Sequence, residues 1–236
     1  MLSKPSRANR TLQVLSKMYS LAIRWKLCTS NPVRGITFFK ENKRDRWLQE
    51  DELNRLLQVL EQHKIYPPAQ VIRLILLTGS RKGEVLNAQW NQFDLDRGVW
   101  VKPFYLTKQK KTEHVPLSQE ALMFLQSLKE HSTSSYVFPG RIADCPLTDI
   151  KKFWARVLKE ANLTDLRIHD LRHTYASHLV SSGLSLSIVG KLLGHTQAAT
   201  TQRYAHLADQ ALRDATNVFG NKIASLKKNG ASSQES

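Results

Sequence analysis

The chain has few cysteines, no long apolar run and a shortage of acidic residues. Its two cysteines, Cys28 and Cys145, lie far apart in the 236 residues and form no CxxC spacing, which argues against a disulfide framework and against a zinc module. No run of about 18 apolar residues is available to cross a bilayer. The N-terminal segment MLSKPSRANR lacks the apolar stretch of a secretory signal. We therefore expect no membrane partner and a cytoplasmic, nucleoid-associated location.

Basic residues outnumber acidic ones by 35 to 20, which gives a formal net charge of +15. The excess is concentrated at the N-terminus: residues 1–46 hold eleven Lys or Arg and two acidic residues, a net of +9, whereas residues 47–164 and 165–236 carry a net of +3 each. A surface of this sign binds phosphate polyanions and releases their counterions. Nucleic acid is therefore the expected partner, and a membrane surface is the weaker alternative.

Length and charge together predict how the chain is divided. A length of 236 residues corresponds to one full domain with an appendage, or to two small domains. We expect a basic helix and linker at 1–46, a larger domain at 47–220 and a flexible polar tail at 221–236. Apolar residues at helical spacing predict a helix at about 8–27. The linker after it supplies candidate DNA contacts, with a merely solubilising segment as the alternative; these candidates are Lys43, Arg44 and Arg46.

Apolar residues recur at helical spacing through most of the larger domain. The segment 48–63 has acidic residues in its first turn. Its predicted buried residues are Leu53, Leu56, Leu57 and Leu60. The segment 69–79 is apolar on nearly every side and should be the central buried helix, and Ser80 is the expected N-cap of the next helix. The expected helices are 48–63, 69–79, 80–90, 119–130, 149–161, 165–181, 186–193 and 205–220.

Residues 93–117 interrupt the helical pattern. Short stretches rich in β-branched and aromatic residues at 93–95, 99–106 and 113–117 predict three strands, and the lysine-rich segment 107–112 predicts a hairpin between the last two. The expected fold class is therefore α+β, mainly α-helical, with a small three-stranded antiparallel sheet.

Two segments in the last third of the chain carry the side chains of a nucleophilic site. They are RIHDLRHTYASHL at 167–179 and LLGHTQAATTQRYAHL at 192–207. A tyrosine hydroxyl has a pKa near ~10, so Tyr204 becomes a useful nucleophile at neutral pH only beside a base and fixed positive charge. His169 and Arg172 are three residues apart and share one face of a helix. Gly194 can end the following helix in the left-handed conformation, which places His195 on an ordered turn. The combination suits attack on a phosphodiester.

Two other interpretations of these segments stay open. His169 and His173 are four residues apart, as in a two-histidine metal face. However, Asp170 stands where the zinc-protease motif has glutamate, and no Cys or carboxylate set completes a site. We therefore expect no metal and no other cofactor. The stretch 182–195 could instead belong to a helix-turn-helix DNA reader whose first helix precedes it, an interpretation that leaves Tyr204 without a role.

Taken together, the motifs resemble those of the catalytic domain of the tyrosine recombinase (phage integrase) family, over roughly residues 45–210. The likeness rests on TGSRKGEVLNAQW, the lysine hairpin ending in VPL, HDLRHTYASHL and LGHTQAATTQRYAH. It implies an integrase-type catalytic domain, preceded at 1–46 by one helix that is the remnant of a DNA-clamping, core-binding domain. It also implies a catalytic set of Arg81, Lys108, His169, Arg172, His195 and Tyr204, with Glu84 as the acidic residue that accompanies Arg81. Lys110 and Lys111 share the hairpin with Lys108 and are expected to contact DNA.

The resemblance implies breakage and rejoining of DNA strands through a covalent 3′-phosphotyrosine. Tyr204 would attack the phosphodiester, and the two arginines of the set would bind the negative charge that develops. His195 would add a hydrogen bond, His169 would take the tyrosine proton, and Lys108 would protonate the leaving 5′-oxygen. No cofactor is implied.

The implied protein is a site-specific DNA recombinase or integrase of a mobile element. Its expected partner is double-stranded DNA, on which it would act as a homotetramer, with a monomer in solution as the alternative state. Two other functions remain open. The chain could be a non-catalytic or truncated DNA-binding remnant, or a type IB topoisomerase-like enzyme that relaxes DNA without a partner site.

Overall fold

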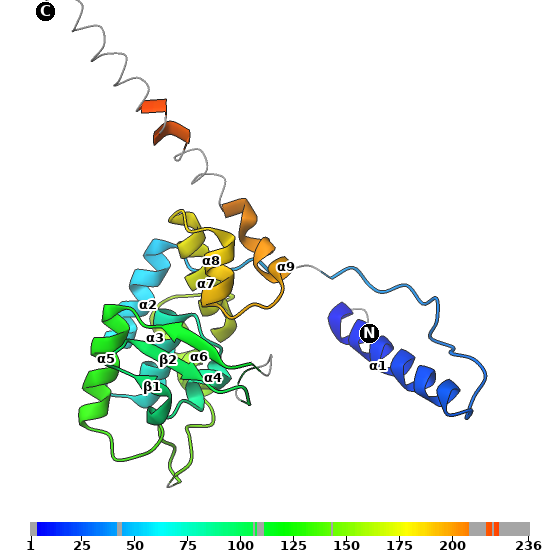
Figure 1. The fold of residues 1–236 in the computed structure, drawn as a ribbon, viewed down its shortest axis with the longest axis horizontal. Helices are drawn as coiled ribbons and strands as arrows, with labels where there is room; N and C mark the ends of the chain where they lie inside the picture. Colours follow the sequence, from blue (N-terminus) through cyan, green and yellow to red (C-terminus); the bar gives the residue numbers. More distant parts are fainter. Residues whose placement is uncertain are drawn as a thin grey trace, which may run out of the picture. The chain divides into compact units, whose positions relative to one another are not determined.

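The structure of the protein, a computed structural model, describes residues 4–41, 44–105, 107, 111–142, 144–207, 216–218 and 220–221. The chain forms two compact units, residues 1–45 and 46–236. Figure 1 shows the helices and strands of both.

The first unit consists of helix α1 (Pro5–Arg24) and an extended segment after it. Proline suits the first turn of a helix because its missing N–H needs no partner there. The side-chain amide of the buried Asn9 donates to the Phe39 carbonyl oxygen and accepts from the Phe39 N–H, both at 2.8 Å. These two bonds hold the extended segment along the helix. The helix predicted at about 8–27 therefore begins and ends three residues earlier than expected.

The second unit is built around helix α3, whose apolar side chains Val71, Ile72, Leu74 and Ile75 are at most 1% exposed. Helices α2, α4, α5, α6 and α7 all pack against it. In Figure 1, α5 lies beside the sheet and α7 and α8 lie above it. The α-helices of this unit are α2 (Glu50–Gln62), α3 (Pro67–Thr78), α4 (Lys82–Leu86), α5 (Gln119–Glu130), α6 (Lys151–Glu160), α7 (Ile168–Ser181), α8 (Leu186–Leu192) and α9 (Ala198–Thr201). Two 3-10 helices, η1 (Trp90–Gln92) and η2 (Gln202–Leu207), complete them.

Three short strands form one antiparallel sheet in the order β1 (Phe93–Asp94), β2 (Val99–Lys102) and β3 (Glu113–Pro116). Alternate residues of β2 face the core, so Trp100 is fully buried and Lys102 is 3% exposed. Lys102 lies opposite Glu113 in the ladder between β2 and β3. The predicted α+β class, mainly helical with a three-stranded antiparallel sheet, is confirmed.

The helix predicted at 80–90 is much shorter than expected. α4 ends at Leu86 because the chain then leaves the helix to pair with a distant loop: the Ala88 carbonyl accepts from Val137 N–H at 2.9 Å, and Trp90 N–H donates to the Ser135 carbonyl at 3.0 Å. Ser80 is not the N-cap that the sequence suggested. Arg81 occupies that position.

Two smaller predictions about the second unit were also wrong. The strand expected at 99–106 stops at Lys102, because Pro103 has no N–H to continue the ladder. Leu57 was expected in the core, but it is 42% exposed on the outer edge of α2.

The segment around α8 agrees with its sequence. Ser185 caps α8 by accepting a hydrogen bond from Ile188 N–H, and Gly194 adopts φ 63°. The helix predicted at 205–220 is described only in part: η2 extends to Leu207, and residues 208–215 and 219 lie outside the described residues. No helix of the described chain is long and apolar enough to span a membrane.

Candidate active site

A cavity of about 400 Å³ opens between the N-terminus of α4, helix α7 and the segment that runs from α8 to η2. Five of the six residues in the implied catalytic set line it. The sixth, Lys108, lies outside the described residues. The lining residues are Arg81, His169, Arg172, His173, His195, Thr196, Gln197, Thr200, Arg203 and Tyr204.

Arg81 reaches the cavity from the N-cap position of α4. The Glu84 carboxylate accepts from Arg81 Nη1 at 2.6 Å and from the Arg81 backbone N–H at 3.1 Å. Glu84 is only 4% exposed. Burial raises the pKa of its carboxyl, but the hydrogen-bonded cations Lys102 and Arg81 outweigh burial and hold the pKa below its ordinary value. An ionised, buried carboxylate therefore fixes the direction of the Arg81 guanidinium.

Arg172 enters the cavity from α7 and is 5% exposed. Its Nη1 donates to the Gly79 carbonyl at 2.8 Å and its Nη2 to the Leu193 carbonyl at 2.5 Å. Burial and the neighbouring Arg81 cation lower the pKa of Arg172 to about 10, so the group stays charged at neutral pH. A guanidinium has five N–H donors. The two tethers therefore fix its plane and leave donors that have no partner among the described residues.

His195 stands on the turn directly after Gly194. Its backbone N–H donates to the Gly190 carbonyl at 2.8 Å, and its ring Nδ1 lies 2.9 Å from the Thr201 hydroxyl. If that hydroxyl donates to Nδ1, the proton of the neutral ring sits on Nε2, where it can be donated to an anion in the cavity.

Tyr204 lies in η2 and is 5% exposed. Its hydroxyl forms a hydrogen bond with Nδ1 of His173 on α7, at 2.5 Å. Nη1 of Arg203 lies 3.5 Å from Nε2 of the same imidazole, and the Arg203 guanidinium lies 5.9 Å from the centre of the Tyr204 ring. The phenol is thus held between an imidazole and a cation.

The histidines of the cavity are neutral at neutral pH. Burial, with a further contribution from Arg203, lowers the pKa of His173 to about 4. Burial and Arg172 do the same for His195, whose pKa is also about 4. Burial also lowers the pKa of His169, whose ring meets that of His173 edge-on with 5.0 Å between centroids. A neutral imidazole can accept a proton, so the cavity holds bases next to the phenol.

The structure describes three of the five residues that the sequence suggests as DNA contacts. Lys43 and Lys110, like Lys108, lie outside the described residues. Arg44 is half-buried and Lys111 is exposed. The guanidinium of Arg46 forms a two-pronged ion pair with Glu52, at 2.6 and 2.7 Å, so we do not include Arg46 among the proposed DNA contacts.

Three residues near the site had no assigned role in the sequence-based set. His173 enters the sequence analysis only as a metal-ligand candidate, although its place four residues after His169 puts it on the same helix face. Arg203 carries no motif signal beyond its position next to Tyr204. Lys102 carries one in the alternation of β2, which points it inward with Trp100, because a lysine at an inward position requires a buried anion.

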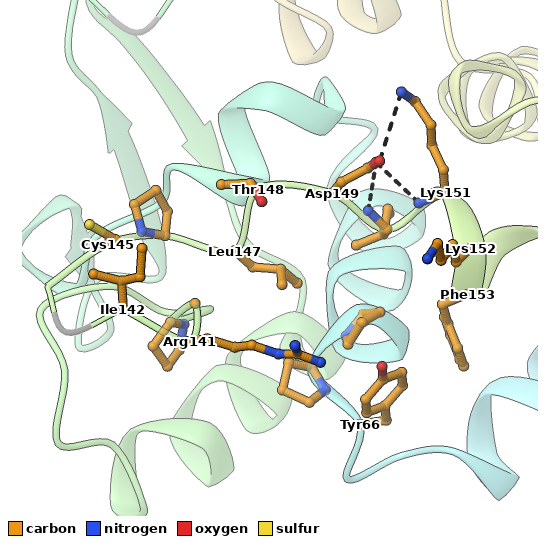
Figure 2. A pocket seen from close by; sticks show the side chains of 16 residues that line it. Tyr66, Arg141, Ile142, Cys145, Leu147, Thr148, Asp149, Lys151, Lys152 and Phe153 are labelled. Atoms are coloured by element: carbon orange, nitrogen blue, oxygen red, sulfur yellow. Dashed lines mark hydrogen bonds and ion pairs between the residues drawn. The ribbon is translucent and has the colours of Figure 1, made fainter.

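A second, larger cavity of about 680 Å³ lies between the start of α3 and the start of α6 (Figure 2). Figure 2 shows the Asp149 carboxylate at its edge, accepting from the backbone N–H groups of Ile150 and Lys151 and facing the Lys151 ammonium at 3.8 Å. None of the five catalytic candidates that the structure describes lines this cavity. Elsewhere too, the described residues contain no group of three or more His, Cys, Asp or Glu side chains that could hold a metal ion.

Comparison with solved structures agrees with the fold. One similar structure is an integrase of the Tn1549 transposon in complex with transposon right end DNA. The alignment covers 90% of this chain and 79% of the integrase chain, with a TM-score of 0.73 and 17% sequence identity. Another is a lambda integrase dimer bound to a core site. That alignment covers 85% of this chain and 59% of the lambda integrase chain, with a TM-score of 0.69 and 22% sequence identity. At these identities the likeness concerns the fold alone.

Sequence comparison identifies the family. The integrase of Salmonella phage P22 is 31% identical over 221 residues, which cover 86% of this chain and 55% of that protein. The shufflon-specific DNA recombinase of Escherichia coli is 30% identical over 199 residues, which cover 83% of this chain and 50% of that protein. The chain thus spans about half the length of these relatives. The phage integrase family matches residues 46–211, and the chain therefore belongs to that family of tyrosine recombinases.

Proposed function

We propose that the chain is the catalytic part of a site-specific DNA recombinase that works through a covalent 3′-phosphotyrosine. One observation carries the proposal: the hydroxyl of Tyr204, two fixed guanidinium groups and three neutral imidazoles line the same cavity of about 400 Å³. Family membership supports recombination as the reaction. The DNA complexes of proteins with this fold support double-stranded DNA as the substrate.

Charge stabilisation is the task of the guanidinium groups. When an oxygen attacks a phosphodiester, negative charge builds on the non-bridging oxygens of the pentacoordinate phosphorus. Arg81 and Arg172 are both held by contacts within the protein before any substrate is present, so they need little reorganisation to bind that charge. His195 adds one N–H donor. Rigid donors aimed at the same oxygens lower the barrier more than the same groups in water.

The proton of the phenol has a direct acceptor. In the tautomer of His173 that carries its proton on Nε2, Nδ1 accepts the hydrogen bond of the phenol, and the phenol proton passes to Nδ1 as the Tyr204 oxygen bonds to phosphorus. The sequence favoured His169 for this role. We propose His173 instead because it contacts the phenol directly, and His169 then supports the His173 ring from its edge-on position.

Bond breakage and rejoining complete the proposed reaction. The bond between phosphorus and the 5′-oxygen breaks, and that oxygen takes a proton from Lys108, which lies in the sequence between β2 and β3. The phosphate stays joined to Tyr204, which conserves the energy of the ester. A 5′-hydroxyl from another strand can then attack the phosphotyrosine and reseal the DNA by the same steps in reverse.

The proposal extends to the parts around the site. Residues 47–220 form the catalytic domain, and residues 1–46 form a basic segment that contacts DNA phosphates through residues such as Lys43 and Arg44. The proposed DNA contacts also include Lys110 and Lys111, which lie in the sequence between β2 and β3. Strand exchange requires four protomers on two DNA sites, so we propose a homotetramer on DNA.

Covalent trapping tests this function. Nicked duplexes that tile the DNA on both sides of the gene lose a short 5′-hydroxyl fragment after cleavage, so the cleaved complex cannot reseal. We expect an adduct that survives denaturant and forms equally well with a chelator present. Tyr204→Phe should abolish the adduct without weakening DNA binding.

The two other candidate functions give different results in the same experiments. A non-catalytic DNA-binding remnant would form no adduct at any concentration, and its salt-dependent binding would be unchanged by Arg172→Ala combined with Tyr204→Phe. A topoisomerase-like enzyme would form the adduct but would also relax supercoiled DNA without sequence preference.

A further inference from the structure

A buried lysine contacts Glu84 on the side of the carboxylate that faces the core. Lys102 on β2 is 3% exposed. Its Nζ lies 2.7 Å from Oε2 of Glu84, 2.8 Å from the Ser80 hydroxyl oxygen and 4.4 Å from the centre of the Trp100 ring. A charge so far from water is stable only when it is paired.

The surroundings of Lys102 fix its ammonium in place. An ammonium has three N–H donors: one is accepted by the Glu84 carboxylate, one by Ser80, and the remaining side faces the electron-rich indole of Trp100. Lys102 does not line the cavity that holds Tyr204. It is therefore not placed to donate a proton to DNA in that cavity, and Glu84 is its hydrogen-bonded link to the Arg81 side chain.

Glu84 binds two cations at once. Its Oε1 takes the Arg81 side chain, while its Oε2 takes Lys102 and the Arg81 backbone N–H. Glu113 lies opposite Lys102 in the sheet, but the ammonium of Lys102 is hydrogen-bonded to Glu84. Glu84 is therefore the anion with which Lys102 is paired.

The charges of this group decide how strongly Arg81 attracts a phosphate. With Arg81 and Glu84 alone, the carboxylate would cancel the guanidinium charge at the edge of the cavity. With Lys102 present, Glu84 is neutralised from the core side. Glu84 can then hold the Arg81 guanidinium in position while the group keeps its net positive charge. In a poorly hydrated environment a buried charge next to this pair affects the field at the edge of the cavity more than the same charge would in water.

We propose that Lys102 is a positioning residue that neutralises Glu84 from behind and so leaves the charge of Arg81 available to the scissile phosphate. This inference rests on the proposed function. It concerns one electrostatic effect, which runs from Lys102 on β2 through Glu84 to Arg81 at the edge of the cavity.

The test compares four proteins: the unmodified chain, Lys102→Met, Glu84→Gln, and the double variant. Methionine matches the length of lysine without its charge. We expect Lys102→Met to slow single-turnover cleavage of a trapping duplex on the order of 10- to 100-fold. DNA affinity, measured in the Tyr204→Phe background, should change less than about threefold because most of the proposed phosphate contacts lie outside this site.

The double variant separates charge from packing. The amide that Glu84→Gln introduces is neutral and still accepts a hydrogen bond from Arg81, so it needs no balancing lysine. We expect the double variant to cleave about tenfold faster than Lys102→Met alone.

Rates are compared well below the melting temperature of each variant. Lys159→Met, which removes one exposed lysine from α6, serves as the control for net charge and should cleave within about twofold of the unmodified rate.

Two cleavage results would overturn the inference: an unmodified rate for Lys102→Met, or a double variant no faster than that single variant. Either leaves the proposed function intact, provided the unmodified chain forms the adduct.

If the unmodified chain forms no adduct, the proposed function fails, and titration with inorganic phosphate still decides the role of Lys102. Phosphate binding is followed through the ring NMR signals of His195, with Arg172→Ala as the negative control. The inference requires several-fold weaker phosphate binding in Lys102→Met and recovery in the double variant. Equal binding in Lys102→Met and the unmodified chain would overturn it.

Discussion

The phenol of Tyr204 and the imidazole of His173 are joined by a hydrogen bond of 2.5 Å between η2 and α7. The two residues are 31 positions apart, and the bond brings the nucleophile candidate to the helix that also carries Arg172. Because the pKa of His173 is about 4, the imidazole is neutral at neutral pH, and the tautomer with its proton on Nε2 presents Nδ1 as an acceptor to the phenol.

This contact predicts which histidine acts as the base. His173→Gln should slow single-turnover cleavage by about 10²- to 10³-fold, the usual loss when a general base is removed. His169→Gln should be less harmful because His169 acts through the His173 ring. Adduct formation under rapid mixing provides the measurement. The reverse order of effects would restore His169 as the base.

The same histidines predict how stability depends on pH. In the folded chain the pKa values of His173 and His195 are about 4, whereas the ordinary histidine pKa is 6.5. Between these values the unfolded chain binds more protons than the folded chain, so the free energy of unfolding rises with pH. The contribution of the two histidines to stability is lost as the pH falls from 6.5 towards 4.

Urea unfolding at about pH 5 and pH 7 measures this dependence. The unmodified chain should have the lower midpoint at the more acidic pH, and a variant with glutamine at both positions should show a smaller difference. Carboxylates with lowered pKa values, such as Glu52 and Glu84, act in the same direction and remain in both proteins. An unchanged difference in the variant would contradict the assigned histidine pKa values.

A side chain at Gly194 is predicted to destabilise the fold. Its φ of 63° is a left-handed conformation, and a Cβ there would overlap the Glu113 carboxylate. Gly194→Ala should lower the free energy of unfolding by about 1–2 kcal/mol or more and should slow cleavage by displacing His195.

Gly83→Ala is the matched control for this glycine. Gly83 lies inside α4, and a Cβ there would meet no atom within 4 Å. Alanine should therefore stabilise the helix by roughly 0.5–1 kcal/mol. Urea denaturation of both variants compares the two sites, and equal effects would argue against the described turn.

Arg172 should not be replaceable by lysine. An ammonium keeps the charge but cannot reach the Gly79 and Leu193 carbonyls while also presenting two donors to a phosphate. Arg172→Lys should slow cleavage on the order of 10²-fold or more. It should also lower the free energy of unfolding by about 1–3 kcal/mol for each buried carbonyl left without a donor. Near-normal cleavage by this variant would argue against bidentate binding.

Much of the fold could be predicted from the sequence because its signals are local. The apolar spacing of 69–79, the cap at Ser185 and the turn at Gly194 each act within a few residues. The end of α4 could not be predicted in this way, since it depends on hydrogen bonds that join Ala88 and Trp90 with a loop more than forty residues away.

In the candidate site, too, local signals could be predicted from the sequence and long-range contacts could not. Motif spacing was enough to select Arg81, Arg172 and Tyr204, and the structure brings all three to one cavity. The partnership of His173 with Tyr204 could not be read from spacing, because it depends on how η2 folds back onto α7. Lys102 carried a signal in the period of its strand, but its partner Glu84 is 18 positions away and becomes visible only when β2 meets α4.

The most direct test of the account is to find the residue that carries the DNA. After trapping on a nicked duplex, the adduct is digested with protease and nuclease, and the modified peptide is sequenced by mass spectrometry. We predict a 3′-phosphonucleotide on the peptide from residues 192–207, attached at Tyr204. A nucleotide attached to any other residue, or a Tyr204→Phe variant that still forms the adduct, would contradict the central claim.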